Sequence, residues 1–210
     1  MSIERGTEAL LMRRREILAQ GAEPIGWKIG FNVPQVQEKL GIDAPLAGFL
    51  TSDGLLEDSD VWSLDGDGEV LVESEVAVEL GDDGRSIAAL LPALELADPP
   101  DLSLDIEAIL AGNIFHRAVV FGPRVETTEP GGARILVNGE EEHVVDARQA
   151  GASLERMVAV VAQRLADAGE ELRAGDRIIT GVLAPPHKAQ PGDTVMLELD
   201  AVGSVALRFS

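Results

Sequence analysis

Hydrophobic and polar residues alternate most regularly between residues 70 and 80, where the sequence reads VLVESEVAVEL. Successive side chains of a strand point to opposite faces, so this segment predicts a strand with one apolar and one acidic face. The aliphatic residues of the apolar face are Val70, Val72, Val76, Val78 and Leu80. Glu73, Glu75 and Glu79 share the other face.

Further strands are predicted where short apolar runs lie between Gly, Asp, Asn and Pro turns. They cover residues 24–31, a hairpin over 133–145 that turns at Asn138-Gly139, closing strands after Gly175-Asp176 and after Gly192-Asp193, and a final hairpin that turns near Gly203. Strands therefore dominate the chain, and they do not alternate with helices as βαβ units would.

Helical spacing occurs in three segments. A first helix is expected to be capped by Thr7 and to end before Gly21, with arginines 13–15 pointing to solvent. A short helix should open near Pro34 and close at Gly41, and an amphipathic helix should cover residues 152–168. The predicted fold class is α+β and β-rich, in one domain over residues 1–210.

Composition narrows the functional classes. No apolar run approaches the ~20 residues of a membrane span, and the N-terminus has no signal-peptide pattern, so a cytoplasmic location without membrane contact is expected. The chain has no cysteine, which excludes disulfides and thiolate chemistry. A net charge of −20 argues against nucleic acid as a partner. The acidity is explained equally by solubility in a salty cytoplasm and by carboxylates that converge on a cation.

Three acidic residues and one lysine are candidates for chemistry. Glu73 and Glu75 lie two apart on one strand face, ~7 Å between Cα atoms, so they could close on a hard cation or form a wet acidic face. Glu95 lies in the apolar stretch LLPALELAD, where a carboxylate is either paired, bound to a metal, or at an edge that reaches water. Lys28 lies among apolar neighbours, which suits proton transfer or anion binding, although a lysine reaching solvent fits equally.

The order of several motifs resembles a known family. They are GWKIGF, VQEKLGIDAPLAGFL, VESEVAVELG, LPALEL, LRAGDRIITG and QPGDTVMLELDAVGSVALRF. Together they resemble 2-keto-4-pentenoate hydratases, which are relatives of 4-oxalocrotonate decarboxylases within the fumarylacetoacetate hydrolase superfamily. The resemblance runs from about Leu10 to the C-terminus.

This resemblance implies a mixed β-roll with a few peripheral helices, a shortened N-terminal helical part at about 1–22, and a homo-oligomer, dimer or larger. It implies that Glu73, Glu75 and Glu95 bind Mg²⁺ or Mn²⁺ and that Lys28 is the catalytic or substrate-contacting lysine. The implied reaction is that of a lyase, a hydratase or decarboxylase, which acts on a small 2-oxo acid through a metal-stabilised enolate in the catabolism of aromatic compounds.

The sequence departs from the family pattern in the half of the site that would meet the substrate. Asp98 is followed by Pro99-Pro100 instead of Ser-Arg, residues 111–113 read Ala-Gly-Asn instead of Ala-Asp-Asn, and residues 181–184 read Gly-Val-Leu-Ala instead of Gly-Ser-x-Thr. These changes suggest another substrate, another reaction or a lost activity.

Two alternatives to the lyase therefore stay open. One is a carbon–carbon hydrolase of the acylpyruvate type with His116 or His187 as its base, although both fit ordinary polar histidines near the surface. The other is a catalytically weakened homologue that binds a metal and a small diacid, or that serves as a structural partner. His143 follows three glutamates and is expected to be solvated.

Overall fold

The computed structural model describes residues 2–66, 68–103, 105–148 and 153–210, and strands make up most of its regular structure. The strands are β1 (Pro24–Gly30), β2 (Leu46–Thr51), β3 (Leu55–Leu56), β4 (Val61–Trp62), β5 (Leu71–Leu80), β6 (Ile87–Ala97), β7 (His116–Phe121), β8 (Gly132–Val137), β9 (Glu140–Asp146), β10 (Arg177–Val182), β11 (His187–Lys188), β12 (Thr194–Leu199) and β13 (Gly203–Phe209). The helices are α1 (Ser2–Ala19), α2 (Pro34–Leu40), α3 (Ile106–Ala111) and α4 (Leu154–Ala166), with a 3₁₀ turn at Ser52–Gly54.

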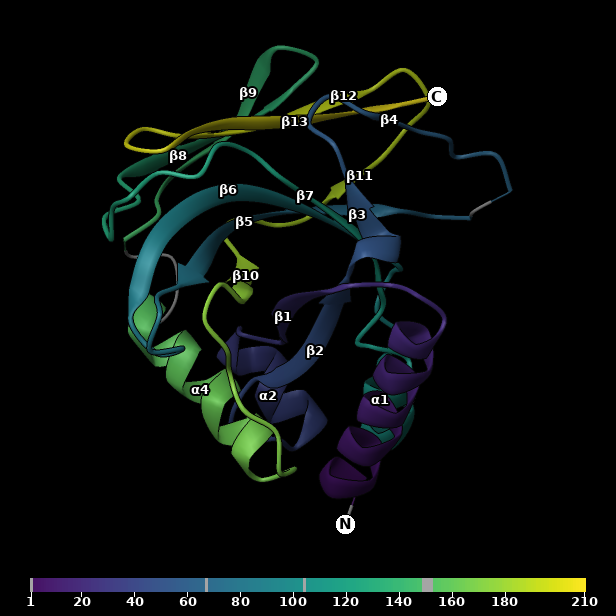
Figure 1. Ribbon diagram of the computed structural model, residues 1–210. Coiled ribbons are helices and arrows are strands. Elements are labelled where there is room, and N and C mark those ends of the chain that lie inside the picture. The colour runs from purple at the N-terminus through teal and green to yellow at the C-terminus, as the bar shows by residue number, and fades with distance from the viewer. Residues whose placement is uncertain (1, 67, 104, 149–152) are drawn as a thin grey trace.

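These strands form two sheets. The larger sheet has the order β2-β1-β10-β5-β6-β7-β3, with β11 paired to β5 beside this row, and the smaller has the order β4-β13-β12-β8-β9. The larger sheet is mixed, because β1 runs parallel to β10 whereas β5 runs antiparallel to both β6 and β10. Figure 1 shows β6 arching over β5 and β10, with the smaller sheet above the arch and the helices below it.

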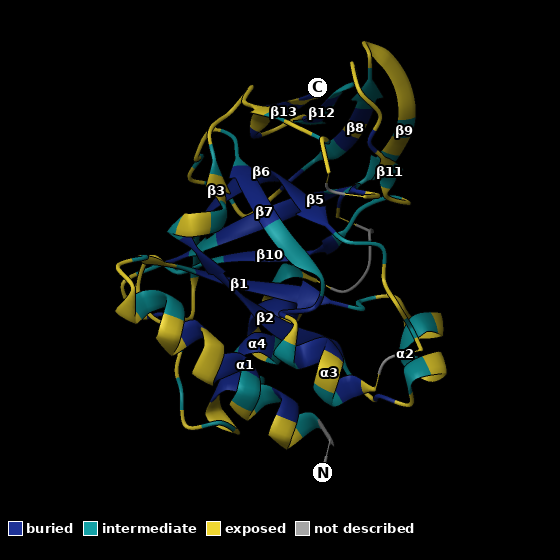
Figure 2. Ribbon diagram, turned by 90° about the vertical axis from the view of Figure 1, so that its right-hand side faces the viewer, coloured by how far each residue is buried: buried dark blue, intermediate teal, exposed yellow. Residues whose placement is uncertain are grey.

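The curl gives the larger sheet an inner and an outer face. The outer face belongs to the main hydrophobic core and is covered by helices at one end and by the smaller sheet at the other. The inner face encloses a second, smaller cluster of buried residues: Leu50, Ala77, Leu91, Ala93, Val119 and Ile179. The central strands are accordingly buried along nearly their whole length, whereas β9 at the edge is exposed (Figure 2). The α+β prediction of a β-rich roll with peripheral helices is confirmed.

The helices differ in how many apolar residues they bury and in what they contact. Helix α4 buries Met157, Val158, Val161 and Leu165 and contacts β1, β2 and β10, and its first turn is capped by the Ser153 hydroxyl. Helix α1 packs against α3 and β2. Helix α2 buries none of its residues, and Gly41 ends it in the left-handed conformation, as predicted.

Most predicted elements are confirmed, including the strand over 24–30, the Asn138-Gly139 hairpin and the three closing strands. The amphipathic helix is confirmed over Leu154–Ala166, and its predicted start at residue 152 lies outside the described residues. The Thr7 cap is wrong, because α1 already begins at Ser2.

The orientation predicted for Arg14 is also wrong. Its side chain is buried, and its guanidinium carbon lies 4.7 Å from the centre of the Trp27 ring. A guanidinium stacks on an indole face while its aliphatic stem packs against the core, so a helical arginine needs no solvent-facing position.

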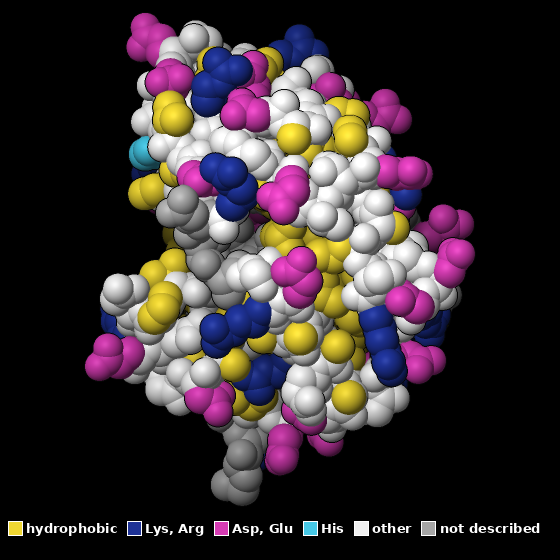
Figure 3. All heavy atoms as spheres, turned by 90° about the vertical axis from the view of Figure 1, so that its left-hand side faces the viewer, with side chains coloured by type: hydrophobic (Ala, Val, Ile, Leu, Met, Phe, Trp, Pro, Cys, Tyr) yellow, Lys and Arg dark blue, Asp and Glu magenta, His cyan; other side chains and the backbone are white. Residues whose placement is uncertain are grey.

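The charged side chains are dispersed over one face of the molecule. On the face shown in Figure 3, Asp and Glu alternate with Lys and Arg and do not gather into one patch. No helix within the described residues is long and apolar enough to cross a membrane. The acidic groups that converge are instead found on the inner face of the roll.

Candidate metal centre

Three glutamates meet on the inner face of β5 and β6. Glu73 lies directly opposite Glu95 in the antiparallel pairing, and Glu75 follows Glu73 on the same face. One carboxylate oxygen from each of the three lies within 4.8 Å of the others. Both Glu75 and Glu95 are fully buried, and Glu73 is partly exposed. The structure therefore brings together the three residues proposed as metal ligands.

Two of these carboxylates have an oxygen without a hydrogen-bond partner among the described residues. Glu75 accepts a hydrogen bond from the Gly181 N–H on one oxygen (2.6 Å), and its Oε1 is left unpaired. Glu95 accepts bonds from Lys28 and His116 on Oε1, and its Oε2 is left unpaired. A buried carboxylate oxygen without a donor is costly, and a hard cation satisfies it. The donor set thus fits a divalent cation.

A bulge in β10 holds the Glu75 side chain. The register with β5 shifts between Ile179 and Val182, which turns the Gly181 N–H toward Glu75. Gly181 has φ +100°, and a Cβ there would lie 2.4 Å from the Asn32 side chain. Only glycine adopts this conformation without strain in so small a space, so Gly181 fixes where the Glu75 carboxylate points.

Lys28 lies on the same inner face, on β1. It is buried, its Nζ bonds to Glu95, and it donates a second hydrogen bond to the carbonyl of Ile114 at 3.2 Å. Gly48 of β2 lies opposite and leaves room for the lysine stem, because a Cβ there would lie 2.8 Å from Lys28 Cγ. The lysine therefore extends along the inside of the roll and does not reach outward to solvent.

Asn113 holds this part of the site together. Its buried side chain accepts a hydrogen bond from the Phe49 N–H (2.9 Å) and donates one to the Phe49 carbonyl (3.0 Å). Asn113, Ile114 and Phe115 all have left-handed backbone angles, with φ of 58°, 52° and 62°. Consecutive left-handed non-glycine residues are strained and persist only where their surroundings hold them. This turn presents the Ile114 carbonyl to Lys28.

The carboxylates titrate abnormally because they are buried close together. Burial first, and then repulsion from Glu95, raises the pKa of Glu73 to about 7 against the attraction of Lys28. Burial and the repulsion of Glu95 and Glu73 raise the pKa of Glu75 well above its ordinary value. Burial also acts to raise the pKa of Glu95, but the attraction of Lys28 and the bond from His116 outweigh it and the pKa is lowered.

Lys28 responds in the opposite sense to its burial. Burial alone lowers the pKa of its ammonium group, but the attraction of Glu95, Glu73 and Glu75 is larger, so the pKa lies above its ordinary value. Three carboxylates facing one ammonium group carry an excess of negative charge when all are ionised. A divalent cation offsets that excess.

The two candidate histidines have different places. His116 Nδ1 lies 2.7 Å from Glu95 Oε1, so the structure brings it to the carboxylates. His187 pairs with Val72, whose side chain belongs to the outer core, and its imidazole lies 2.9 Å from Asp193. The structure therefore does not bring His187 to the carboxylates, because β11 turns its side chain toward the smaller sheet.

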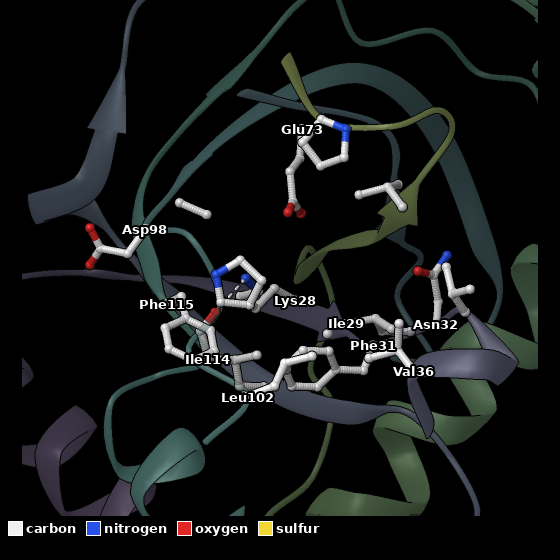
Figure 4. A pocket seen from close by; sticks show the side chains of 16 residues that line it. Lys28, Ile29, Phe31, Asn32, Val36, Glu73, Asp98, Leu102, Ile114 and Phe115 are labelled. Carbon is white, nitrogen blue, oxygen red and sulfur yellow. Dashed lines mark hydrogen bonds between the residues drawn. The ribbon is translucent and has the colours of Figure 1, made fainter. Parts of the chain in front are cut away.

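A cavity of ≈ 220 Å³ opens beside the carboxylates (Figure 4). Glu73 points into it from β5, and Lys28 lies at its floor. Its other lining residues include Phe31, Asn32, Val36, Asp98, Leu102, Ile114, Phe115 and Val182. Pro100 and Val182, two of the departures from the family pattern, also line this cavity.

Sequence reasoning missed several residues of this site. Phe31, Phe115 and Leu102 line the cavity, and Asn113 braces it, but none of them was singled out for such a role. The only signal near Asn113 was the partly matching Ala-Gly-Asn motif at 111–113. The apolar residues carry no pattern of their own, since they come from four separate segments of the chain.

A curled mixed sheet with three converging carboxylates and a buried lysine on its inner face defines a class of protein with an acidic centre suited to a divalent cation. Residues 58–210 match the family described as "Fumarylacetoacetate (FAA) hydrolase C-terminal". The chain belongs to the fumarylacetoacetate hydrolase family.

The chain is similar to 4-oxalocrotonate decarboxylase of Pseudomonas putida, with 26% identity over 95% of this chain and 81% of the relative. It is similar to 2-keto-4-pentenoate hydratase 1 of Dechloromonas aromatica (strain RCB), with 27% identity over 93% of this chain and 81% of that protein. The fold is similar to the solved structure of 4-oxalocrotonate decarboxylase from Pseudomonas putida G7 complexed with magnesium and adipate, with a TM-score of 0.89 and 23% identity over 100% of this chain and 87% of that one.

Proposed function

We propose that this protein is a metal-dependent lyase, of the hydratase or decarboxylase type, that acts on a small 2-oxo acid. The observation that carries the proposal is the pair of unpaired, buried carboxylate oxygens of Glu75 and Glu95 beside Glu73, which lines the adjoining cavity. The relatives named as a decarboxylase and a hydratase support the reaction type.

Glu73, Glu75 and Glu95 would hold the cation, and all-oxygen ligands favour Mg²⁺ or Mn²⁺. When bound, such a cation supplies Lewis acidity to the carboxylate and keto oxygens of a 2-oxo acid. Glu73 is the member of the three that faces the cavity, so the substrate would enter from that side. The burial of Glu75 and Glu95 excludes water from the other sides of the centre.

Lys28 is proposed to contact the substrate. It is the one lysine or arginine among the described residues that line the cavity, and its ammonium group is fixed by Glu95 and the Ile114 carbonyl. A fixed ammonium group beside the keto oxygen stabilises negative charge that develops there and holds a proton for transfer.

His116 is proposed as a positioning residue. Its ring nitrogen contacts Glu95, and it is not among the described residues that line the cavity. An N–H held against a ligand carboxylate orients that ligand. The carbon–carbon hydrolase alternative needed a histidine base facing the substrate, and neither His116 nor His187 is in the described cavity wall. This placement favours the lyase.

The family resemblance also supports a cytoplasmic homo-oligomer, dimer or larger, with a place in the catabolism of aromatic compounds. Light scattering coupled to size-exclusion chromatography tests the assembly. A monomeric mass at micromolar concentration would contradict it.

The proposed site is tested by thermal unfolding with Mg²⁺ or Mn²⁺, with and without oxalate, which mimics the planar enolate of a 2-oxo acid. Oxalate should raise the melting temperature only when metal is present, since a ligand at a hundred times its Kd stabilises the folded state by ~2.7 kcal/mol. Glu75→Gln should abolish this response, whereas Glu79→Gln, a change of the same kind on the same face of the same strand, should keep it.

No response of the wild-type protein to metal and oxalate would overturn the proposed centre and favour a homologue that serves as a structural partner. Where the response is present, turnover of 2-oxo acids in metal against chelator separates the lyase from a binding protein. Turnover no faster in metal than in chelator would overturn the lyase.

A further inference from the structure

The chemistry of the cavity beyond Glu73 and Lys28 bears on which 2-oxo acid the site accepts. The names of the relatives leave this open, because 4-oxalocrotonate carries a carboxylate at its far end and 2-keto-4-pentenoate does not. The lining residues beyond Glu73 and Lys28 are called the distal wall here. Whether this wall carries a positive charge decides which of the two kinds of tail the cavity favours.

The wall is apolar on most sides. Phe31, Leu102, Ile114 and Phe115 form its lower part in Figure 4, and Val36 closes the side next to Asn32. The remaining lining side chains are also apolar apart from Lys28, Glu73, Asp98 and the uncharged amide of Asn32: Ile29, Val33, Ala97, Pro100, Val182 and Pro186.

The charges available to a distal carboxylate are unfavourable. Among the described lining residues the charged groups are Lys28, Glu73 and Asp98. Lys28 is bonded to Glu95 at the floor, beside the acidic centre, so it serves the 2-oxo end of the substrate. Asp98 lies at the rim and repels a second anion when it is ionised. Its partner Arg117 donates a hydrogen bond from Nε to Asp98 Oδ1 at 2.6 Å and does not line the cavity.

Pro100 and Val182 also line the cavity, and neither side chain offers an anion a charge or a hydrogen-bond donor. An anion moved from water to such a wall loses its hydration without gaining a counter-charge, whereas an apolar tail gains from leaving water.

We infer that the site accepts a 2-oxo monocarboxylic acid with an uncharged, apolar tail and discriminates against 2-oxo dicarboxylic acids. This inference rests on the proposed function and narrows its substrate class. The volume of ≈ 220 Å³ restricts the tail to a short one. Residues of the distal wall, Val36 among them, then determine specificity through the absence of charge.

The test compares 2-oxohexanoate with 2-oxoadipate, which differ only in a terminal methyl group against a terminal carboxylate, with pyruvate as the reference without a tail. Binding is measured by calorimetry in Mg²⁺ or Mn²⁺. We expect 2-oxohexanoate to bind at least about ten-fold more tightly than 2-oxoadipate, because the dicarboxylate buries an unpaired charge. Equal or tighter binding of 2-oxoadipate would overturn the inference.

Val36→Lys supplies the missing counter-charge from α2, a helix with no buried residues, so the fold should tolerate it. It should shift the ratio of the two affinities toward 2-oxoadipate by about ten-fold. Gln35→Lys is the matched control, because residue 35 is exposed on the same helix and does not line the cavity. An equal shift in Gln35→Lys would show a long-range charge effect and overturn the role of the wall.

The outcomes separate the two proposals. Absence of metal-dependent pyruvate binding would overturn the proposed function itself. Metal-dependent pyruvate binding without discrimination between the two six-carbon acids would overturn the specificity inference alone.

Discussion

Glu75 and Glu79 lie on the same face of β5, yet the charged side chains around them are mainly of opposite sign. Glu79 accepts hydrogen bonds from Arg124 (2.6 Å) and Arg177 (3.2 Å). Burial acts to raise the pKa of Glu79, but the bonds from these two arginines outweigh it, so the pKa is lowered. Glu75 has one backbone donor, two glutamates as neighbours, and a raised pKa.

The difference shows what separates a structural carboxylate from one available to a ligand. At the Glu79 end of the roll the counter-charges come from the protein, and Arg177 also lies over the Phe121 ring at 5.0 Å. At the Glu75 end one lysine faces three glutamates, so an excess of negative charge is left for a cation to neutralise.

The largest effect is expected on catalysis. Glu75→Gln should lower metal-dependent turnover by more than about 100-fold, since loss of groups that merely support a ligand already costs 10- to 100-fold. Glu79→Gln should leave turnover within about three-fold of wild type, because Glu79 contacts arginines and not the acidic centre. Steady-state kinetics of a 2-oxo acid substrate measure both. Comparable losses in the two variants would show that the two ends do not differ in function.

Removing the ammonium group of Lys28 should unbalance the acidic end further. Lys28→Met leaves Glu95 buried without its counter-charge, so the metal-free protein should lose about 3–5 kcal/mol of unfolding free energy. Saturating Mg²⁺ should restore part of this loss. Urea unfolding with and without the metal measures it. A variant as stable as wild type without metal would contradict a required Lys28–Glu95 pair.

The response to pH should differ between metal-free and metal-bound protein. The folded-state pKa of Glu73, raised to about 7, favours the protonated group, so its contribution to metal-free stability is present below its unfolded pKa and is lost as pH rises through about 7. Metal binding needs the ionised groups, so the metal-induced rise in melting temperature should grow over the same range. Thermal unfolding at several pH values, each with metal and with chelator, checks this. A metal effect independent of pH would contradict the raised pKa.

The smallest effect is expected at the balanced end. Arg124→Gln removes one exposed partner of Glu79 but leaves Arg177, so the melting temperature should fall by no more than about 2 °C. The variant should gain no second metal site, which calorimetric titration with Mn²⁺ reports. An additional bound Mn²⁺ would show that Arg124 alone suppresses cation binding at Glu79.

The strand pattern of β5 and the carboxylates on its inner face followed from the alternation at 70–80, because side-chain direction on a strand has a period of two. The Asn138-Gly139 hairpin and the Gly41 helix end followed from backbone chemistry that few other residues share. Local periodicity and turn chemistry act within a few residues, and a sequence displays them directly.

The candidate site was predictable only in part. Glu73, Glu75, Glu95 and Lys28 were identified from their strand, their apolar surroundings and the resemblance, and the structure brings them together. His187 was placed with them as a candidate, but a strand of two residues turns it toward Asp193. Asn113 went unnoticed as a brace because its partner, Phe49, is 64 residues away along the chain.

Alternation, turn chemistry and motif order establish a β-rich α+β chain without cysteine, the acidic face of one strand, and the resemblance to the fumarylacetoacetate hydrolase family. Which glutamates lack counter-charges depends on the tertiary structure. Glu75 and Glu79 are equivalent in the alternating pattern of β5. They differ in the folded protein because Arg124 and Arg177 bond to Glu79, whereas Glu95 pairs with Glu73, the neighbour of Glu75 on the same face. The balance of charge at each end depends on distances between residues that are remote in sequence, and alternation along one strand contains no information about those distances.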